Sequence, residues 1–287
     1  MKKFKIKSYC KINLFLRVIK KLKSGYHNIS SLITFCDLHD VISISKIDYK
    51  KDQINFSGKF AKNINSNSNT ITKVLYHLRR IGFIKKESFR INVKKNIPHG
   101  SGLGGGSSNA AALLNFFKAK MHLKISKNVM THIAFKIGSD VPVILDKKNK
   151  ILTGRKNEIL SIKNKFNLNI IIVYPNISCS TKKIFKKNKY FSSKKIDFYK
   201  AQKSKIKLIN HLKGERNDLE NIVIKLHPKV RRLINFIRIQ DGCYFSRITG
   251  SGSACIGIFS DKMNAISAQK LIKLKFPKYW SVVSKTM

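Results

Sequence analysis

Apolar and polar residues alternate along three stretches of the chain, and this alternation predicts strands. It runs through residues 3–19 and the segment "DVISISK" at 40–46, and it is cleanest in "SFRINVKKNIP" at 88–98. The third stretch has Phe89, Ile91 and Val93 on one face and Arg90, Asn92 and Lys94 on the other. A strand with one apolar and one solvated face is typical of antiparallel sheets.

Apolar residues at helical spacing predict three helices in the first half. Residues 69–81, "NTITKVLYHLRRI", form an amphipathic pattern with Asn69 as its N-cap. A second helix is expected over 107–123 with Ser107 or Ser108 as N-cap, and a third over 126–137, ending at Gly138. The segment "SDVPVIL" at 139–145 then predicts a short strand that opens behind a turn.

The second half mixes both element types. Strands are expected at 168–174, 244–250 and 254–260, and helices near 218–226, 228–239 and 262–273. The Lys-rich stretch 182–207 has no clear periodicity. Because helices and strands mix without a regular βαβ alternation, the pattern predicts an α+β protein. A boundary near 150–165 would divide it into an N-terminal domain, 1–160, and a C-terminal domain, 161–287.

A strong positive charge raises the question of nucleic-acid binding. The 287 residues carry a formal net charge of +45, from 59 basic and 14 acidic residues. Only ten of the basic residues are Arg, the side chain preferred for bidentate phosphate and base contacts. The Lys excess accompanies heavy Ile and Asn usage, which indicates drift of the genome towards A/T-rich codons. We therefore expect no specific nucleic-acid partner, and a basic nucleic-acid-binding protein remains an alternative.

Cysteine usage and hydropathy indicate which cellular location the protein has. The five cysteines are scattered and show no C-x-x-C spacing, so neither a disulfide framework nor a protein metal site is indicated. The most apolar internal run, "NLNIIIVYP" at 167–175, is too short to span a bilayer. Charged residues also interrupt the apolar stretch near the N-terminus. These features predict a cytoplasmic protein with no membrane contact.

One glycine-rich segment, "PHGSGLGGGSSNAAALL" at 98–114, predicts an anion site. A strand, a glycine loop and a helix N-terminus together direct backbone N–H groups and a helix dipole at a guest such as a polyphosphate. The Walker A pattern fails because Gly106 stands at its lysine position. A dinucleotide fingerprint is met literally by Gly100, Gly102 and Gly105, but the preceding strand is amphipathic and no acidic residue stands about twenty residues on.

The loop resembles the phosphate-binding motif of the GHMP kinase superfamily. Two further segments resemble others of that superfamily: "CKINLFLRV" at 10–18 and "ITGSGSACIGIF" at 248–259. Within the superfamily, "KINLFL" with "SGYHNISSLITFCDLHDVISI" resembles the kinases that phosphorylate the 2-hydroxyl of 4-diphosphocytidyl-2-C-methyl-D-erythritol in the non-mevalonate isoprenoid pathway. Another small-molecule kinase of the superfamily, of the homoserine or mevalonate type, remains an alternative.

The resemblance implies a fold and its cofactors. It implies a two-domain GHMP kinase fold, with a ribosomal-protein-S5-domain-2-like N-terminal domain and a ferredoxin-like α/β C-terminal domain. The active site would lie in the cleft between them. ATP and Mg²⁺ would be the cofactors, and the cytidine diphosphate methylerythritol the small-molecule substrate. Magnesium prefers phosphate oxygens and water to a cage of protein ligands, so no protein metal site is required. The oligomeric state stays open.

The resemblance also assigns the catalytic pair. Asp140, in the small and apolar context "IGSDVPV", would be the base that takes the proton from the 2-hydroxyl, and Lys11 would lie beside it and stabilise charge on the transferring phosphoryl. Without the resemblance, Asp140 is equally well a turn or capping residue. Cys10 and Ile12 flank Lys11, which makes a solvated position less expected for this lysine than for the others.

Binding residues follow from the same motifs. ATP phosphates would be held by Pro98, Gly100, Gly102, Leu103, Gly104, Gly105, Gly106, Ser107 and Ser108, with Asn69 at the adenine. The acceptor substrate would be held by Asn13, Tyr26, His27, Thr181, Phe185, Gly250 and Gly252, with the cytosine ring between Tyr26 and Phe185 and its edge at His27. From the residues alone, Tyr26 and His27 fit a turn, Phe185 a core position and Asn69 a helix cap.

Overall fold

The computed structural model describes residues 2–62, 64–120, 125–153, 159–192 and 204–287. The chain forms two compact units. Unit 1 comprises Met1–Lys11, Leu38–His99 and Gly104–Lys147, and unit 2 comprises Ile12–Asp37, Gly100–Leu103 and Lys148–Met287. Two long strands, β1 (Lys3–Lys21) and β2 (His27–Ile47), pair with each other and contribute residues to both units.

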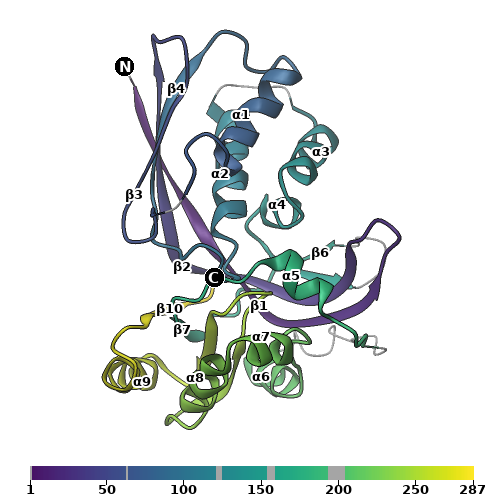
Figure 1. Cartoon of the computed structure of the whole chain (residues 1–287), viewed down its shortest axis with the longest axis vertical. Coiled ribbons are helices and arrows are strands. Elements are labelled where there is room, and N and C mark those ends of the chain that lie inside the picture. The colour runs from purple at the N-terminus through teal and green to yellow at the C-terminus, as the bar shows by residue number, and fades with distance from the viewer. Residues whose placement is uncertain (1, 63, 121–124, 154–158, 193–203) are drawn as a thin grey trace. The chain divides into compact units, whose positions relative to one another are not determined.

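In unit 1, the described residues form four helices and a sheet. Strand β3 (Gln53–Ser57) runs parallel to β4 (Ser88–Lys94), which pairs antiparallel with the second half of β2. The helices are α1 (Thr70–Arg80), α2 (Gly105–Lys120), α3 (Lys127–Ile137) and the short α4 (Val141–Ile144). The rings of Phe89 on β4 and Phe117 on α2 meet edge to face at 5.0 Å, so α2 packs on the apolar face of this sheet (Figure 1).

Unit 2 holds an antiparallel sheet of four strands in the order β10-β7-β9-β8. These are β7 (Asn169–Tyr174), β8 (Cys243–Ile248), β9 (Cys255–Phe259) and β10 (Trp280–Lys285). The first half of β2 pairs with β5 (Asn149–Thr153), which pairs with β6 (Ile159–Ile162). The described helices of unit 2 are α5 (Thr181–Lys186), α6 (Lys205–Lys213), α7 (Glu220–Leu226), α8 (Pro228–Arg238) and α9 (Lys262–Lys275).

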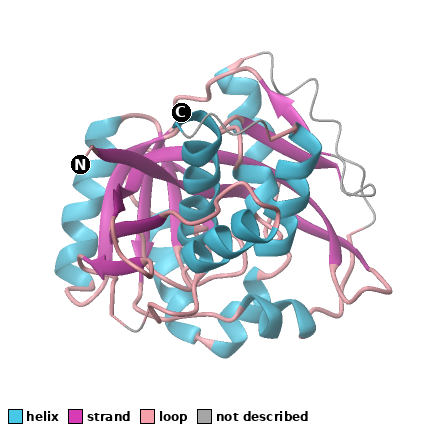
Figure 2. Ribbon diagram, turned by 90° about the horizontal axis from the view of Figure 1, so that it is seen from above, coloured by secondary structure: helices cyan, strands magenta, loops and turns pink. Residues whose placement is uncertain are grey.

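Most expected elements are confirmed, and helices and strands follow one another along the chain in no regular order. Figure 2 shows the helices in cyan and the strands in magenta. Helix α1 has Asn69 as N-cap and buries Ile71, Val74, Leu75 and Leu78, as its pattern predicted. Helix α3 begins behind Ser126 and ends at Gly138. The strands near 168–174, 244–250 and 254–260 correspond to β7, β8 and β9. Periodicity succeeds here because each element presents one face to a core.

Two local predictions were wrong. The segment 139–145 forms helix α4 instead of a strand, because Pro142 fits the first turn of a helix, where no backbone N–H is needed. Helix α2 begins at Gly105, so Ser107 and Ser108 lie in its first turn and neither is the N-cap. The helix starts earlier than expected because the Gly104 carbonyl already accepts the Ser108 N–H at 2.8 Å.

Other elements were not anticipated. Strands β3, β5, β6 and β10 and helices α5 and α6 had no clear pattern, and part of the Lys-rich stretch, 193–203, lies outside the described residues. A single domain boundary near residue 160 stays a proposal, since the compact units are discontinuous in sequence. Among the helices that the structure describes, none is long and apolar enough to cross a membrane.

Candidate active site

Lys11 and Asp140 form an ion pair in unit 1. Lys11 lies on β1 between two fully buried residues, and its ammonium is 3.4 Å from Asp140 Oδ2. The Lys11 side chain is 6% exposed, whereas that of Asp140 is 49% exposed. Asp140 occupies the N-cap position of α4, yet its side chain makes no capping hydrogen bond. The carboxylate therefore faces a buried cation on one side and solvent on the other, an arrangement that suits proton transfer.

Gly104, the residue before α2, packs against Lys11. Gly104 has a φ of +69°, and a Cβ at this position would lie 3.0 Å from Lys11 Cε. Only glycine therefore brings the backbone this close to the lysine. The helix N-terminus supplies N–H donors and positive potential next to the Lys11 side chain, which is the environment that an anion needs.

Ser108 carries a buried hydroxyl that has no hydrogen-bond partner among the described residues. Its side chain lies in the first turn of α2, and the residue is 2% exposed. Buried polar groups are nearly always paired, so an orphaned hydroxyl at a helix N-terminus is a position where a ligand oxygen would be stabilised. This observation fits a bound phosphate group.

Asn69 caps α1 with its side-chain oxygen and bonds the preceding loop with its side-chain nitrogen. Its Oδ1 accepts from the backbone N–H groups of Ile71 and Thr72, and its Nδ2 donates to two backbone carbonyls, of Asn65 and Ser66. The capping interpretation is thus confirmed, and contact with adenine stays a prediction. Thr70, the next residue, donates its hydroxyl to the Gly106 carbonyl at 2.8 Å, which joins the start of α1 to the glycine loop.

A buried ion pair between Asp40 and Lys95 was missed in the sequence. Lys95 is 3% exposed and Asp40 fully buried, and their side chains are in direct contact. Asp40 Oδ1 also accepts the N–H groups of Asn96 and Ile97, which precede the loop. A Cβ at Gly105 would lie 3.3 Å from Lys95 Nζ, so this ammonium is adjacent to the first residue of α2.

The alternation of apolar and polar residues in the two segments could have predicted this buried pair. Lys95 falls on the same face of its strand as Phe89, Ile91 and Val93, and Asp40 on the same face as Ile42 and Ile44. A charged residue at an apolar position of a regular pattern predicts a buried and paired charge.

In unit 2, the second glycine turn packs directly on residues 100–103 of the loop. The Ala254 N–H donates to the Ser101 carbonyl at 3.0 Å. A Cβ on Gly102 would overlap the Thr249 carbonyl and the Gly252 N–H, and a Cβ on Gly252 would overlap the Ser101 backbone. The two backbones are thus in contact, and both positions require glycine.

Asn13 joins this arrangement from β1. The residue is 2% exposed, its N–H donates to Thr249 Oγ1 at 2.8 Å, and its Nδ2 donates to Ser31 Oγ at 2.7 Å. The first bond fixes the Asn13 backbone and the second fixes its side chain, both by partners within unit 2. Thr249 and Ser31 are further residues that motif reasoning did not identify.

His27 and Phe185 come together in unit 2, with ring centroids 5.1 Å apart and planes inclined by 34°. Burial, and to a lesser extent the charge of Lys21, lower the pKa of His27, which favours a neutral imidazole. Tyr26 is 66% exposed beside the turn of a hairpin in which its carbonyl accepts the Leu22 N–H. The turn interpretation of this position is therefore confirmed, and stacking on cytosine stays a prediction.

Thr181 begins α5, the helix that carries Phe185. Its hydroxyl accepts from Ser251 Oγ at 2.9 Å, which links α5 to the second glycine turn. Phe185 is half-buried against the core of unit 2, so the core interpretation also holds in part.

A separate cavity of about 670 Å³ lies in unit 1, lined by residues of β3, α1 and the segment 85–88. None of the predicted site residues lines it. Arg79 lines this cavity, and its guanidinium makes a bidentate ion pair with the Asp52 carboxylate, which neutralises its charge.

Comparison with known proteins identifies the family of this chain. A family model described as GHMP kinases N terminal domain matches residues 69–147, and one described as GHMP kinases C terminal matches 198–278. A protein of Pelagibacter ubique named 4-diphosphocytidyl-2-C-methyl-D-erythritol kinase is 41% identical and is covered in full, as is this chain. The chain belongs to this kinase family. The relative of the same name in Wolbachia pipientis is 34% identical, with 98% of this chain and 97% of that protein covered.

Solved structures support the 4-diphosphocytidyl-2-C-methyl-D-erythritol kinase fold. A crystal structure of 4-(cytidine 5'-diphospho)-2C-methyl-D-erythritol kinase matches with a TM-score of 0.76 at 22% identity, over 98% of this chain and 99% of that chain. A homoserine kinase from Cytophaga hutchinsonii matches at 0.74 and 16% identity, over 100% and 95%. At these identities the matches establish the fold alone. The expected α+β GHMP kinase fold is confirmed.

Proposed function

We propose that this protein transfers the γ-phosphoryl group of ATP to the 2-hydroxyl of 4-diphosphocytidyl-2-C-methyl-D-erythritol, a step of the non-mevalonate route to isoprenoid precursors. The full-length identity of 41% to a kinase named for that substrate carries the proposal. The paired Lys11 and Asp140 beside a glycine-rich helix N-terminus support it with chemistry.

Asp140 acts as the general base. Its half-exposed carboxylate accepts the proton of the 2-hydroxyl as the hydroxyl oxygen bonds to the γ-phosphorus, and the bond from that phosphorus to the bridging oxygen breaks, so that ADP leaves. Negative charge then spreads over the oxygens of the transferring phosphoryl group, and the Lys11 ammonium, 3.4 Å from the carboxylate, stabilises that charge. Because Lys11 is buried and held between Asp140 and Gly104, it is preorganised for this role.

The loop from Pro98 to Ser108 holds the phosphates of ATP. The orphaned Ser108 hydroxyl and Gly104, where an added Cβ would lie 3.0 Å from Lys11 Cε, support this proposal. Mg²⁺ bound with the nucleotide would neutralise phosphate charge during transfer. Ser107 and Ser108, in the first turn of α2, would supply hydroxyls to the phosphates or to Mg²⁺. Asn69 would contact the adenine, and the bond from Thr70 Oγ1 to the Gly106 carbonyl, which joins the start of α1 to the loop, supports this.

The cytidine half of the acceptor is bound by ring contacts and a neutral imidazole. Phe185 and Tyr26 flank the cytosine ring, and His27, already against Phe185, reads its edge. Thr181, Asn13, Gly250 and Gly252 position the diphosphate and the methylerythritol. We further propose a cytoplasmic location and no specific nucleic-acid partner, because ATP is the phosphoryl donor and the charge is carried by lysines spread along the whole chain.

The test incubates the purified protein with ATP and 4-diphosphocytidyl-2-C-methyl-D-erythritol and follows phosphorylation by mass spectrometry. Mevalonate and homoserine serve as control substrates. We expect one added phosphate on the cytidine substrate alone. Phosphorylation of homoserine or mevalonate instead would assign the chain to another activity of the fold. Absence of turnover on all three, together with salt-sensitive RNA binding, would favour the nucleic-acid alternative.

A further inference from the structure

The segment Glu215–Glu220 contains a buried asparagine that no motif assigned. Asn217 is 5% exposed, and its Nδ2 donates to the carbonyls of Gly250 at 2.8 Å and Ile248 at 3.2 Å. Its Oδ1 accepts the Leu219 N–H at 3.0 Å. The amide thus holds both the entry to the second glycine turn and its first glycine, which has a φ of +60°.

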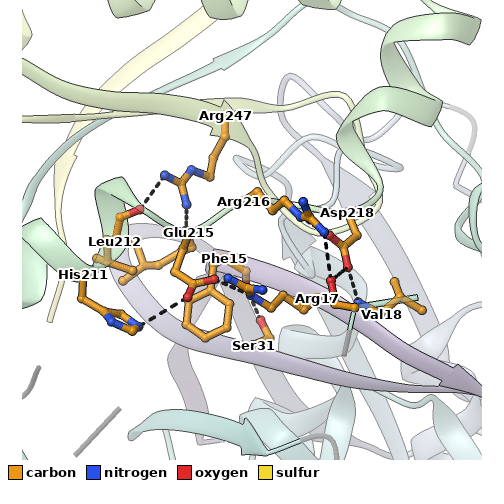
Figure 3. Close-up of polar contacts among 12 residues, drawn as sticks. Phe15, Arg17, Val18, Ser31, His211, Leu212, Glu215, Arg216, Asp218 and Arg247 are labelled. Carbon is orange, nitrogen blue, oxygen red and sulfur yellow. Dashed lines mark hydrogen bonds and ion pairs between the residues drawn. The ribbon is translucent and has the colours of Figure 1, made fainter. Parts of the chain in front are cut away.

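Asn217 is itself rigidly held. Its flanking backbone pairs with Leu16 of β1, through Leu16 N–H to the Arg216 carbonyl at 3.1 Å and Asp218 N–H to the Leu16 carbonyl at 2.8 Å. Side chains on either side of it bind the same strand (Figure 3). Arg17 Nε is 2.6 Å from Glu215 Oε2, and the Val18 N–H donates to Asp218 Oδ2 at 2.8 Å.

The turn that Asn217 holds contacts three groups of proposed binding residues in unit 2. Thr249 accepts the Asn13 N–H, Ser251 donates to Thr181, and the Thr249 carbonyl and Gly252 lie against Gly102. A displacement of the turn would therefore move β1, α5 and the front of the glycine loop with respect to one another.

We propose that Asn217 is a positioning residue for the acceptor substrate, acting through the turn 249–252. The inference rests on the proposed function, because it takes the acceptor to be the substrate that this turn helps to place. Asn217 does not itself touch substrate in this scheme. Its two donated bonds set the backbone that does, and misplacement of such a backbone by about 1 Å costs up to a hundredfold in rate.

Asn149 is a matched control. It is 7% exposed and, like Asn217, donates from Nδ2 to two backbone carbonyls, at 2.8 and 3.2 Å, those of Asn164 and Met287. It lies on β5 in the same unit, and none of the proposed site residues is among these partners. Asn217→Asp and Asn149→Asp both replace the donating amide by a group that only accepts, so each removes the same number of hydrogen bonds.

The experiment measures kcat/KM for the cytidine substrate, the urea midpoint and amide hydrogen exchange in the full-length wild type and both variants. We expect Asn217→Asp to lower kcat/KM by at least about tenfold and to speed exchange at Thr249 and Ala254, whose N–H groups are bonded within the turn and to Ser101. Asn149→Asp should lower the midpoint comparably, with kcat/KM within about twofold of wild type.

The possible outcomes distinguish failure of the positioning role of Asn217 from failure of the proposed function. Equal kcat/KM in the two variants, or unchanged exchange at Thr249 and Ala254 in Asn217→Asp, would overturn the positioning role. A wild type without turnover would remove the proposed function and with it the substrate placement, whereas exchange would still report whether Asn217 sets the turn. If Asn217→Asp does not fold, Asn217→Ser against Asn149→Ser gives the same comparison, because serine keeps a shorter donor without adding charge.

Discussion

Asp140 carries the most specific expectation at the scale of single residues. Asp140→Asn keeps the shape of the side chain and removes its ability to take a proton. We expect kcat to fall by about 10² to 10⁴, with KM for both substrates within about threefold of wild type. The variant also leaves the buried Lys11 ammonium without its anionic partner, so the free energy of unfolding should fall by about 1–3 kcal/mol, less than for a pair buried on both sides because solvent reaches the position of the carboxylate. Retained kcat with a large rise in KM would remove the general-base role.

The buried pair Asp40 and Lys95 gives a second prediction at this scale. Asp40→Asn should reduce the free energy of unfolding in urea by about 3–5 kcal/mol, because it leaves the Lys95 ammonium buried without its anionic partner. The double variant Asp40→Asn/Lys95→Met should recover much of this loss, since no buried charge is left. A loss below about 1 kcal/mol in the single variant would mean that solvent reaches the ammonium.

At the scale of elements, two glycine segments make close backbone contact. Gly102→Ala places a Cβ against backbone atoms of Thr249 and Gly252 at a φ of +91°, so it should separate the loop from the turn and abolish most activity. Gly82→Ala is the control, because Gly82 has a φ of +76° but open space around its missing Cβ. It should cost about 1–2 kcal/mol of stability with kcat/KM unchanged. Equal effects would attribute the Gly102 loss to backbone strain alone.

At the scale of the whole molecule, the net charge of +45 sets the response to salt. Like charges repel in the compact state, and salt screens them over about 8–10 Å. Raising KCl from about 10 to about 150 mM should therefore raise the thermal midpoint, as followed by circular dichroism. Sucrose at equal osmolality controls for solvent exclusion and should reproduce only part of the rise. A midpoint that falls with KCl would mean that attractive pairs outweigh the repulsion.

The sequence by itself determined the elements that have one buried face and the motifs that lie contiguous in the chain. Helix α1 with its Asn69 cap, strand β4 and the glycine loop could all be predicted, because periodicity, capping and glycine content act over a few neighbouring residues. Family membership could be inferred as well, since its motifs are local and keep their order. Local rules failed at 139–145, where a strand pattern and a proline at the start of a helix compete.

Only the tertiary structure decided which distant residues meet. The ion pair of Lys11 with Asp140, the contact of Gly102 with the turn 249–252, and the bonds of Asn217 to Ile248 and Gly250 join residues far apart in sequence. No local propensity records such pairs, because their energies appear only when the strands are in register and the cores are packed. The amino-acid sequence therefore indicated the chemistry of the site, whereas tertiary packing alone determined which residues hold the site in place.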